Sequence, residues 1–408
     1  MKEFSIPFSY RSPLITAIKN KRKQQDKMKK DFSPTLLDFG PLQIFLARHF
    51  GFCYGVENAI EIAFRTVDEH PDKRIFLLSE MIHNPQVNKD LTDRGVRFLQ
   101  DTHGNKLIDF ESLTHEDIVI IPAFGTTLAI ENQLKEIGIE THKYNTTCPF
   151  VEKVWNRSEQ IGKKDYTVVV HGKPTHEETR ATFSHAASGT PTVVVNDMTE
   201  TILLGEYISG KKPASSFEKD FAGRYSAGFD VKKDLNRIGV VNQTTMLASD
   251  TQGIADYLKQ VMMTTYQLDD SNISDHFADT RDTLCYATND NQSAIYGLLK
   301  QPAHLAIVVG GYNSSNTSHL LELTEKELPS YFINDSEKII SKSEILHYDL
   351  HKKEEIHSTG FIPDINPVRI LISSGASCPD ALVENVINKI ASFYGTSIEA
   401  SGISEQFM

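Results

Sequence analysis

The stretch "TTCPFVEKVW", residues 146–155, places a cysteine directly before a proline at the expected start of a helix. Pro149 suits the first helical position, because the amide hydrogen that proline lacks has no partner inside the helix there. The free N–H groups and positive dipole end of such a helix favour a thiolate, so we expect a functional thiol at Cys148. Apolar residues then recur at helical spacing, namely Val151, Val154, Trp155 and Ile161.

Two more of the four cysteines stand in the same setting. Cys53 in "GFCYGVENAIEIAF" and Cys285 in "TLCYATNDNQSAIYGLL" also precede segments with helical spacing. Each helix is followed by an apolar strand and a polar loop: "RIFLLS" with "IHNPQ", "YTVVVHG" with "PTHEET", and "HLAIVVGG" with "YNSSN". A second strand then ends in a loop of small, hydroxyl-bearing residues: "IVIIPAFGTT", "RIGVVNQTT" and "RILISSGAS". The unit of cysteine, helix, strand, polar loop, helix, strand and hydroxyl loop therefore occurs three times.

Alternating strands and helices predict an α/β fold with parallel sheets and functional residues at the carboxyl ends of the strands. Because 408 residues exceed one ordinary core, we expect several domains. They are 43–147 with Cys53, 148–284 with Cys148 and 285–395 with Cys285, between an extension 1–42 and a tail 396–408. If the three face one axis, three cysteines and six polar loops meet. The alternative is three unrelated α/β segments with incidental cysteines.

The composition, with 39% hydrophobic and 24% charged residues, is typical of a soluble globular protein. No apolar run is long enough for a membrane span, and the N-terminus lacks a signal-peptide pattern. Four cysteines in so long a chain favour a reducing cytosol over a disulfide scaffold. The net charge of −12 argues against nucleic-acid binding. We expect the basic run 19–30 to be a solvated, partly disordered extension, ahead of an RNA arm, a membrane arm or a transit peptide.

Three cysteines from separate units, without a C-x-x-C pair, do not resemble a zinc ribbon. A zinc ion with three thiolates and one open position is an alternative. An iron–sulfur cluster held by Cys53, Cys148 and Cys285 fits better, because one iron then lacks a protein ligand and can bind a substrate. Cys378 in "GASCPD" would close the cluster if it were a fourth ligand, but we expect a small buried residue there.

The polar loops carry neutral donors of the kind that hold phosphate oxygens, whereas a G-x-x-x-x-G-K-S/T phosphate loop is absent. A small diphosphate is the ligand that this pattern predicts. Glu178 stands beside His176 in "HEET"; near a metal and a phosphate its pKa would rise toward a useful acid–base value. The candidate donors are His83, His176, Thr244, Ser314, Asn316 and Ser377.

Eight motifs in order resemble those of the LytB family, the 4-hydroxy-3-methylbut-2-enyl diphosphate reductases, in their longer plant and cyanobacterial type. They are "GFCYGVENAI", "IHNPQV", "TTCPFVEKV", "HGKPTHEETRAT", "NQTTM", "TLCYATNDNQSAI", "NSSNT" and "GASCPD". The resemblance covers about residues 43–395, with two charged insertions near 208–236 and 335–365. It implies three pseudo-symmetric α/β domains in a trefoil around one central 4Fe–4S cluster with three cysteine ligands and an open iron.

The resemblance also implies the reaction, which is the last step of the non-mevalonate isoprenoid pathway. The diphosphate substrate would lose its hydroxyl group and give isopentenyl and dimethylallyl diphosphates in the cytoplasm. Ferredoxin or flavodoxin would supply two electrons, and neither nucleic acid nor membrane would take part. Glu178, acting through Thr244, matches the proton-delivering residue. Residues at the family's diphosphate-binding positions are His83, His176, Ser314, Ser315, Asn316 and Ser377.

Two positions depart from the common family pattern. Phe124 stands where many bacterial members have a histidine that binds the diphosphate, although the longer type also has phenylalanine there. Cys378 replaces the usual alanine after Ser377. Two other classes of function stay open on the sequence: a thiol-based redox protein that uses Cys148, and a non-catalytic iron–sulfur electron carrier that needs Cys378 as a ligand.

Overall fold

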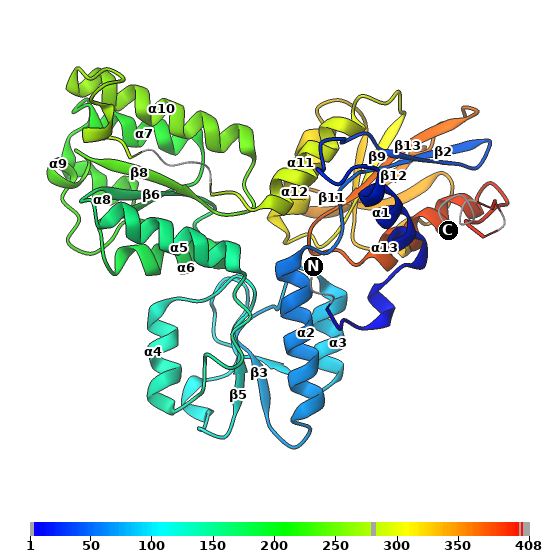
Figure 1. Ribbon diagram of the computed structural model, residues 1–408, viewed down its shortest axis with the longest axis horizontal. Coiled ribbons are helices and arrows are strands. Elements are labelled where there is room, and N and C mark those ends of the chain that lie inside the picture. The colour runs from blue at the N-terminus through cyan, green and yellow to red at the C-terminus, as the bar shows by residue number, and fades with distance from the viewer. Residues whose placement is uncertain (1–3, 279–282, 400, 403–408) are drawn as a thin grey trace. The chain divides into compact units, whose positions relative to one another are not determined.

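The computed structural model describes residues 4–278, 283–399 and 401–402. It divides into two compact units (Figure 1), which we describe separately. Unit 1 consists of Met1–Glu57, His83–Val87 and Tyr286–Met408; unit 2 consists of Asn58–Ile82 and Asn88–Cys285. Helices alternate with the parallel strands through most of the chain, so the predicted α/β class is confirmed.

Unit 2 holds two three-stranded parallel sheets that share one strand order. The first runs β4-β3-β5, with β3 (Ile75–Leu77) in the centre, β4 (Arg97–Phe98) and β5 (Ile118–Ile120). The second runs β7-β6-β8, with β6 (Thr167–His171) in the centre, β7 (Thr192–Val195) and β8 (Ile238–Asn242). In each sheet the two strands predicted from the repeat are direct neighbours, while β4 and β7 are strands that the repeat did not reveal.

The sheet of β6, β7 and β8 is covered on both faces, which explains its continuous apolar strands. Alternate residues of β6 point to opposite sides: Val169 packs with the helices α7 (Met198–Ile208) and α10 (Ala248–Tyr266). Val168 and Val170 pack with α5 (Pro149–Gly162) and α6 (Glu177–Ala187), on the other side of the sheet (Figure 1). The other α-helices that lie wholly in this unit are α4 (Leu128–Ile137), α8 (Phe217–Asp220) and α9 (Val231–Asp234).

Unit 1 contains a five-stranded sheet in the order β1-β2-β13-β9-β10. Its part β10-β9-β13 repeats the order of both other sheets, with β9 (Leu305–Val309), β10 (Ser330–Ile333) and β13 (Val368–Ser374). The threefold repeat predicted from the sequence is therefore present as three sheets of one topology. Two further strands, β2 (Leu42–Leu46) parallel to β13 and β1 (Thr35–Asp38) antiparallel to β2, widen this third sheet.

The segment ahead of each cysteine pairs with the sheet of another repeat. For Cys148 and Cys285 this is the preceding sheet in the chain, and for Cys53 it is the third sheet. Asn145 forms a parallel bridge with Ile121 after β5, and Phe277 with Ile238 of β8. In the same way β2, ahead of Cys53, pairs with β13. The expected domain start at residue 43 therefore does not coincide with a sheet boundary, because residues 43–46 complete the third sheet, not the first.

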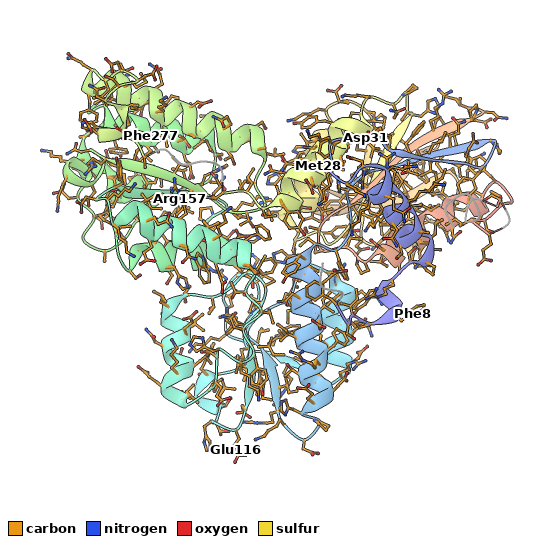
Figure 2. All side chains as sticks on the ribbon, viewed as in Figure 1. Phe8, Met28, Asp31, Glu116, Arg157 and Phe277 are labelled. Atoms are coloured by element: carbon orange, nitrogen blue, oxygen red, sulfur yellow. The ribbon has the colours of Figure 1, made fainter. Side chains whose placement is uncertain are left out.

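The expectation of a solvated, partly disordered N-terminal extension is wrong, because this segment is folded against unit 1. Residues Pro13–Gln25 form helix α1, which Ser12 caps by accepting from the amide of Ile15 at 2.9 Å. Ile15 is fully buried, and Tyr10 and Ile18 are nearly so, whereas Phe8 is exposed (Figure 2). The expectation was wrong because it rested on the charged residues 19–30 alone. The apolar residues that pack against the core lie just before them, in "PLITAI".

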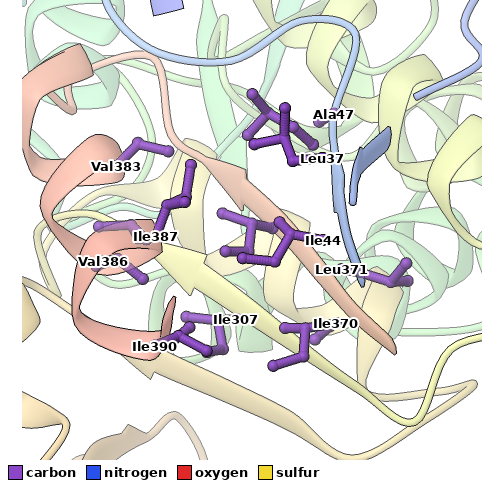
Figure 3. Packing of buried hydrophobic residues seen from close by; sticks show 14 of the residues in the cluster. Leu37, Ile44, Ala47, Ile307, Ile370, Leu371, Val383, Val386, Ile387 and Ile390 are labelled. Atoms are coloured by element: carbon purple, nitrogen blue, oxygen red, sulfur yellow. The ribbon is translucent and has the colours of Figure 1, made fainter. Parts of the chain in front are cut away.

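The core of unit 1 joins the two ends of the chain (Figure 3). Leu37 and Ile44 of the N-terminal strands pack with Ile370 of β13 and with Val386 and Ile390 of α13 (Asp380–Ser392). Of the expected tail 396–408, Ile398 packs into this core, and residues 400 and 403–408 lie outside the described residues. The other helices that lie wholly or partly in this unit are α2 (Tyr54–Glu69), α3 (Pro85–Asp93), α11 (Tyr286–Leu298) and α12 (Ser315–Thr324).

The two segments expected as insertions are folded. Near 335–365, β11 (Glu344–Asp349) and β12 (Glu354–Thr359) form a separate antiparallel hairpin. Near 208–236, Phe217 of α8 and Phe221, which directly follows this helix, stack at a centroid distance of 4.8 Å and belong to the same core as α7 and α10. Both segments therefore add packed structure to their units.

Candidate functional site

The three repeated cysteines lie where the sequence predicts them, directly before α2, α5 and α11. Cys148 is the N-cap of α5, with Pro149 in the first helical position. Its amide donates to the carbonyl of Ala123 at 2.9 Å, and its carbonyl accepts from the amide of Val151 at 2.8 Å. The carbonyl of Cys53 accepts from the amide of Glu57 at 3.0 Å. These backbone bonds fix each thiol at the start of its helix.

The thiolate expected from the helix start is not favoured at Cys148 when no metal is bound. Burial, together with smaller contributions from the neighbouring Cys285 and Glu178, raises the pKa of this thiol to about 11. The amides of Phe150 and Val151 lower the pKa, as the helix-start argument predicts, but burial outweighs them. A free thiol in this setting stays protonated at neutral pH, unlike the low-pKa cysteines of thiol enzymes.

Glu178 is the candidate side chain of unit 2 with the best-defined hydrogen bonds. It is 1% exposed, and His176 caps its helix, α6, by accepting from the amide of Glu178 at 3.1 Å. Both carboxylate oxygens bind one residue: Oε1 accepts from the amide of Thr244 at 2.5 Å and Oε2 from its hydroxyl at 3.0 Å. The carbonyl of Thr244 in turn accepts from the amide of Cys285 at 3.1 Å. Thr244 therefore connects the carboxylate to the backbone of one cysteine.

Gln243 holds together the two strand-end loops that carry Glu178 and Thr244. Its Oε1 accepts from the amide of Lys173 at 3.1 Å and from the hydroxyl of Thr179 at 3.0 Å. Gly172 allows this close approach, because a Cβ there would lie 2.6 Å from the Thr179 hydroxyl. Gln243 is fully buried, so the motif "NQTT" supplies a structural residue directly before Thr244. We did not assign a role to Gln243 from the sequence.

Phe124, the departure noted in the loop after β5, contacts a candidate ligand residue. Its ring meets the imidazole of His176 edge to face, with centroids 5.5 Å apart. Trp155, expected only on a helix face, lies under the same loop: a Cβ on Gly125 would be 2.6 Å from its ring. The indole also stacks on His185 at 3.7 Å. Phe124 therefore takes an apolar packing role against His176, where the common family pattern has a donor.

Unit 1 gathers the other candidate donors at the carboxyl ends of β9 and β13. The Ser377 hydroxyl donates to the Ser314 hydroxyl at 3.4 Å and to the His83 carbonyl at 3.3 Å. Ser314 caps α12 by accepting from the amide of Thr317 at 3.3 Å. The two hydroxyls and the backbone carbonyl of His83, distant in sequence, thus lie together, and Ser315 begins the helix that Ser314 caps.

Asn316 is buried with half of its amide satisfied. Its Oδ1 accepts from the amide of Ala376 at 2.9 Å and from the Nδ2 of Asn291 at 3.3 Å. Within the residues that the structure describes, the Nδ2 of Asn316 has no hydrogen-bond partner. A buried N–H group without a partner is costly, so its presence is typical of a position that binds an acceptor from outside.

Two glycines permit the close packing of these strand-end loops. A Cβ on Gly311 would lie 2.1 Å from the carbonyl oxygen of His83, and a Cβ on Gly375 would lie 1.9 Å from the hydroxyl of Thr317. Backbone atoms cannot move out of the way as a flexible side chain can, so glycine is required at position 311. The motifs "VVGGYNSSN" and "SSGAS" therefore combine donors with the space that lets them converge.

Unit 1 also links the residues that follow two of the cysteines. The amide of Tyr54 donates to the hydroxyl of Tyr286 at 3.0 Å. The amide of Cys53 donates to the carbonyl of Ala376, in the loop after β13, at 3.2 Å. The sequence carries a signal for the first contact, since "CY" occurs at both positions.

Cys378 differs from the other three cysteines, as we expected. It is fully buried in the apolar core of unit 1, whereas the other three are partly exposed. Burial raises its pKa to about 12. All four cysteines are free of disulfides. Among the described residues, no group of three or more His, Cys, Asp or Glu side chains is arranged so that it could hold a metal ion. Cys53 belongs to unit 1, and Cys148 and Cys285 belong to unit 2.

The helices within the described residues include none with the length and apolar character needed to cross a membrane.

Comparison with protein families gives a match over most of the chain. The family model described as LytB protein matches residues 44–391. A 4-hydroxy-3-methylbut-2-enyl diphosphate reductase of Prochlorococcus marinus subsp. pastoris is 39% identical over 384 residues, which is 94% of this chain and 90% of that protein. The reductase of Synechococcus sp. strain CC9605 is 41% identical over 355 residues, or 87% of this chain and 86% of that protein.

Two solved structures share the fold. One is (E)-4-hydroxy-3-methylbut-2-enyl diphosphate reductase, the terminal enzyme of the non-mevalonate pathway, with a TM-score of 0.51 and 24% identity. The match covers 86% of this chain and 99% of that chain. The other is the E-1-hydroxy-2-methyl-but-2-enyl-4-diphosphate reductase of Plasmodium falciparum, with a TM-score of 0.60 and 22% identity. It covers 85% of this chain and 86% of that chain.

Proposed function

We propose, from the premise that this chain belongs to the LytB protein family, that it is an iron–sulfur oxidoreductase that reduces 4-hydroxy-3-methylbut-2-enyl diphosphate. The observation that carries the proposal is the buried pair of Glu178 and Thr244 beside two cysteines. Burial away from water disfavours the charged form of a carboxyl group, so such a group can carry a proton, and a hydroxyl bonded to it can relay that proton to a bound group.

The cofactor in this proposal is one 4Fe–4S cluster held by Cys53, Cys148 and Cys285. The donor set fits it: three partly exposed, disulfide-free thiols stand at helix starts, where neighbouring amides can donate to sulfur. When bound, such a cluster supplies one iron without a protein ligand and passes electrons one at a time. Cys378 is not among the ligands in this proposal, because it is buried in the apolar core.

The substrate diphosphate would be held by neutral donors. In unit 1 these are the Nδ2 of Asn316, which is buried without a partner, and the side chains of Ser314, Ser315, Ser377 and His83. The buried setting strengthens each donor, because bonds to a charged oxygen are stronger where water is excluded. His176, oriented by Phe124, is the donor that we assign to unit 2.

The reaction in this proposal breaks the bond between the allylic carbon and its hydroxyl oxygen. Two electrons and two protons enter, and one water molecule leaves with the hydroxyl oxygen. Glu178 supplies the proton that turns the leaving hydroxyl into water, and the Thr244 hydroxyl, 3.0 Å from its Oε2, positions that proton. The second proton reaches either end of the allylic carbons, which gives isopentenyl or dimethylallyl diphosphate.

The electrons must come from a partner, and we propose ferredoxin or flavodoxin. We also propose that the enzyme acts in the cytoplasm, where a reducing environment preserves an exposed iron–sulfur centre. Two observations weigh against the alternatives that the sequence left open. A thiol-based redox protein needs a low pKa at Cys148, and burial raises it. An electron carrier with four cysteine ligands needs Cys378, which lies in the apolar core.

A Mössbauer spectrum of iron-57-labelled, anaerobically purified protein tests this function. We expect one iron distinct from the other three, with a signal that changes when the hydroxymethylbutenyl diphosphate is added. Four equivalent irons that ignore the substrate would point to an electron carrier. Absence of iron after careful anaerobic reconstitution would overturn the proposal.

A further inference from the structure

A basic segment stands out in a strongly acidic chain. Residues 19–31 contain seven lysines and arginines against two aspartates, a net charge of +5, while the whole chain carries −12. In a chain of this balance, such a run is not needed for solubility. The segment belongs to unit 1 and forms the end of α1 and the turn that follows.

Three of these cations have acidic partners inside the fold. Lys19 binds Asp380 at 2.7 Å, Arg22 binds Asp31 at 2.9 Å, and Lys29 binds Asp290 at 3.0 Å. The pairs of Lys19 and Lys29 attach the segment to α13 and α11, and the pair of Arg22 and Asp31 links two parts of the segment itself. Three other cations of the segment, Lys23, Lys27 and Lys30, are exposed and have no acidic partner within the described residues. Their charge is therefore available to solvent and to a partner.

Two exposed lysines line one surface hollow of about 470 Å³. They are Lys30, with Asp31 and Phe32 next to it in the chain, and Lys300, which follows Tyr296 of α11 and also lines the hollow. Lys300 has no acidic partner in the described part of the chain either. Two large apolar side chains are exposed beside these charges: Met28 at 73% (Figure 2) and Tyr296 at 50%. We call Lys23, Lys27, Met28, Lys30, Tyr296 and Lys300 the basic patch.

The basic patch is joined to the residues next to two cysteines. The Nζ of Lys29 lies 5.3 Å from the ring centroid of Tyr286, which directly follows Cys285. The hydroxyl of Tyr286 accepts from the amide of Tyr54, which directly follows Cys53. The ring of Phe32 meets that of His49, in the loop before Cys53, edge to face at 5.8 Å. A protein seated on the patch would therefore approach the chain segments that hold these two thiols.

We propose that the basic patch is the docking surface for an acidic one-electron carrier protein. This inference rests on the proposed function, which consumes two electrons per turnover and needs an external donor. A chain with net charge −12 repels an acidic carrier over most of its surface. A local positive patch with exposed apolar side chains therefore determines where such a carrier binds. A charged rim around a few apolar contacts is typical of short-lived electron-transfer complexes, which need fast exchange more than affinity.

The test compares two charge reversals of equal size in the full-length holoenzyme. The patch variant carries Lys23→Glu, Lys27→Glu, Lys30→Glu and Lys300→Glu. The control variant carries Lys211→Glu, Lys219→Glu, Lys232→Glu and Lys233→Glu, at exposed positions of unit 2. Both change the net charge by the same amount. Each is assayed with a reduced acidic 2Fe–2S ferredoxin and, separately, with reduced methyl viologen, a small reductant that needs no docking surface.

We expect the patch variant to raise the KM for ferredoxin about tenfold or more at low salt and to lose most of its salt dependence. The control variant should change this KM about threefold at most, and methyl viologen should drive both variants at the wild-type rate. Equal loss in both variants, or none in the patch variant, would overturn the docking proposal. Binding of the patch to anionic vesicles or RNA without an effect on the ferredoxin KM would also overturn it. Wild-type protein that fails with methyl viologen would instead contradict the proposed function.

Discussion

Replacing Asn316 with aspartate changes one buried group at the candidate diphosphate site. The two bonds accepted by Oδ1, from the amide of Ala376 and the Nδ2 of Asn291, can persist in the variant. They also favour the ionised carboxylate, because hydrogen bonds to the charged form stabilise it. What changes is the Nδ2 position, which has no partner in the described residues: a donor becomes a negatively charged oxygen.

The expected loss of binding has two parts. The lost bond from Nδ2 to a charged phosphate oxygen is worth about 1.5–3 kcal/mol. Repulsion between two charges about 4 Å apart adds about 4 kcal/mol at the effective dielectric constant of a protein surface. The two parts together amount to about 5.5–7 kcal/mol, and each 1.4 kcal/mol is a factor of ten, so kcat/KM should fall about 10⁴- to 10⁵-fold.

The assay is the rate with reduced methyl viologen as a function of substrate concentration, together with the iron content. Asn388→Asp is a matched control in the same unit, since its Oδ1 also accepts a backbone bond, from Ile398 at 3.2 Å. We expect Asn388→Asp to keep kcat/KM within about threefold. If Asn316→Asp does the same while retaining its cluster, Asn316 is not a substrate donor and the reasoning from its buried Nδ2 is refuted.

Other substitutions test the remaining parts of the site and fold. Thr244→Val should lower kcat about 10²-fold or more with iron content unchanged, whereas Thr244→Ser should stay within a few fold; equal rates would refute the proton path. Ile15→Ala should lower the free energy of unfolding by about 2–5 kcal/mol in urea titrations, and a change below about 0.5 kcal/mol would mean that α1 is not packed. Cys378→Ala should retain the full iron content, while Cys148→Ala should lose most of it; the reverse pattern would exchange their roles.

The sequence predicted many helices and strands correctly, because these elements are determined mainly by residues close together in the chain. Apolar strands such as "YTVVVHG" and helix starts such as "TTCP" depend on neighbouring residues, and the structure places β6 and α5 at these positions. Short strands are harder to predict: β4 consists of Arg97 and Phe98 and becomes a strand only by pairing with β3. Its place in the sheet depends on pairing with residues about twenty positions earlier, and the hydrophobic periodicity of the sequence does not indicate such pairing.

The sequence indicated the candidate donors of the site, but it did not indicate the residues that hold the donor-bearing loops in place. Hydroxyl and imidazole groups at strand ends are visible in the sequence, and the structure brings Ser314, Ser377 and the His83 backbone together. The supports are visible only in contacts. Gln243 joins two loops, and Trp155 lies under Gly125, although neither residue has a distinctive sequence setting. The pKa of Cys148 shows the same limit, since burial, a property of the folded chain, outweighs the helix start.

The pairing of β2 with β13 has a consequence for how Cys53 is held. Ala47 donates to the carbonyl of Ile372 at 2.9 Å, and Cys53 donates to the carbonyl of Ala376 at 3.2 Å. The first cysteine in the sequence is thus anchored to β13 and the loop after it, more than 300 positions later, while the backbone of Cys285 is anchored to Thr244. Loss of packing in the core of unit 1 should therefore release Cys53 before it disturbs Cys285. Because a bound cluster would contact both, cluster binding in our proposal must also stabilise unit 1 against local opening.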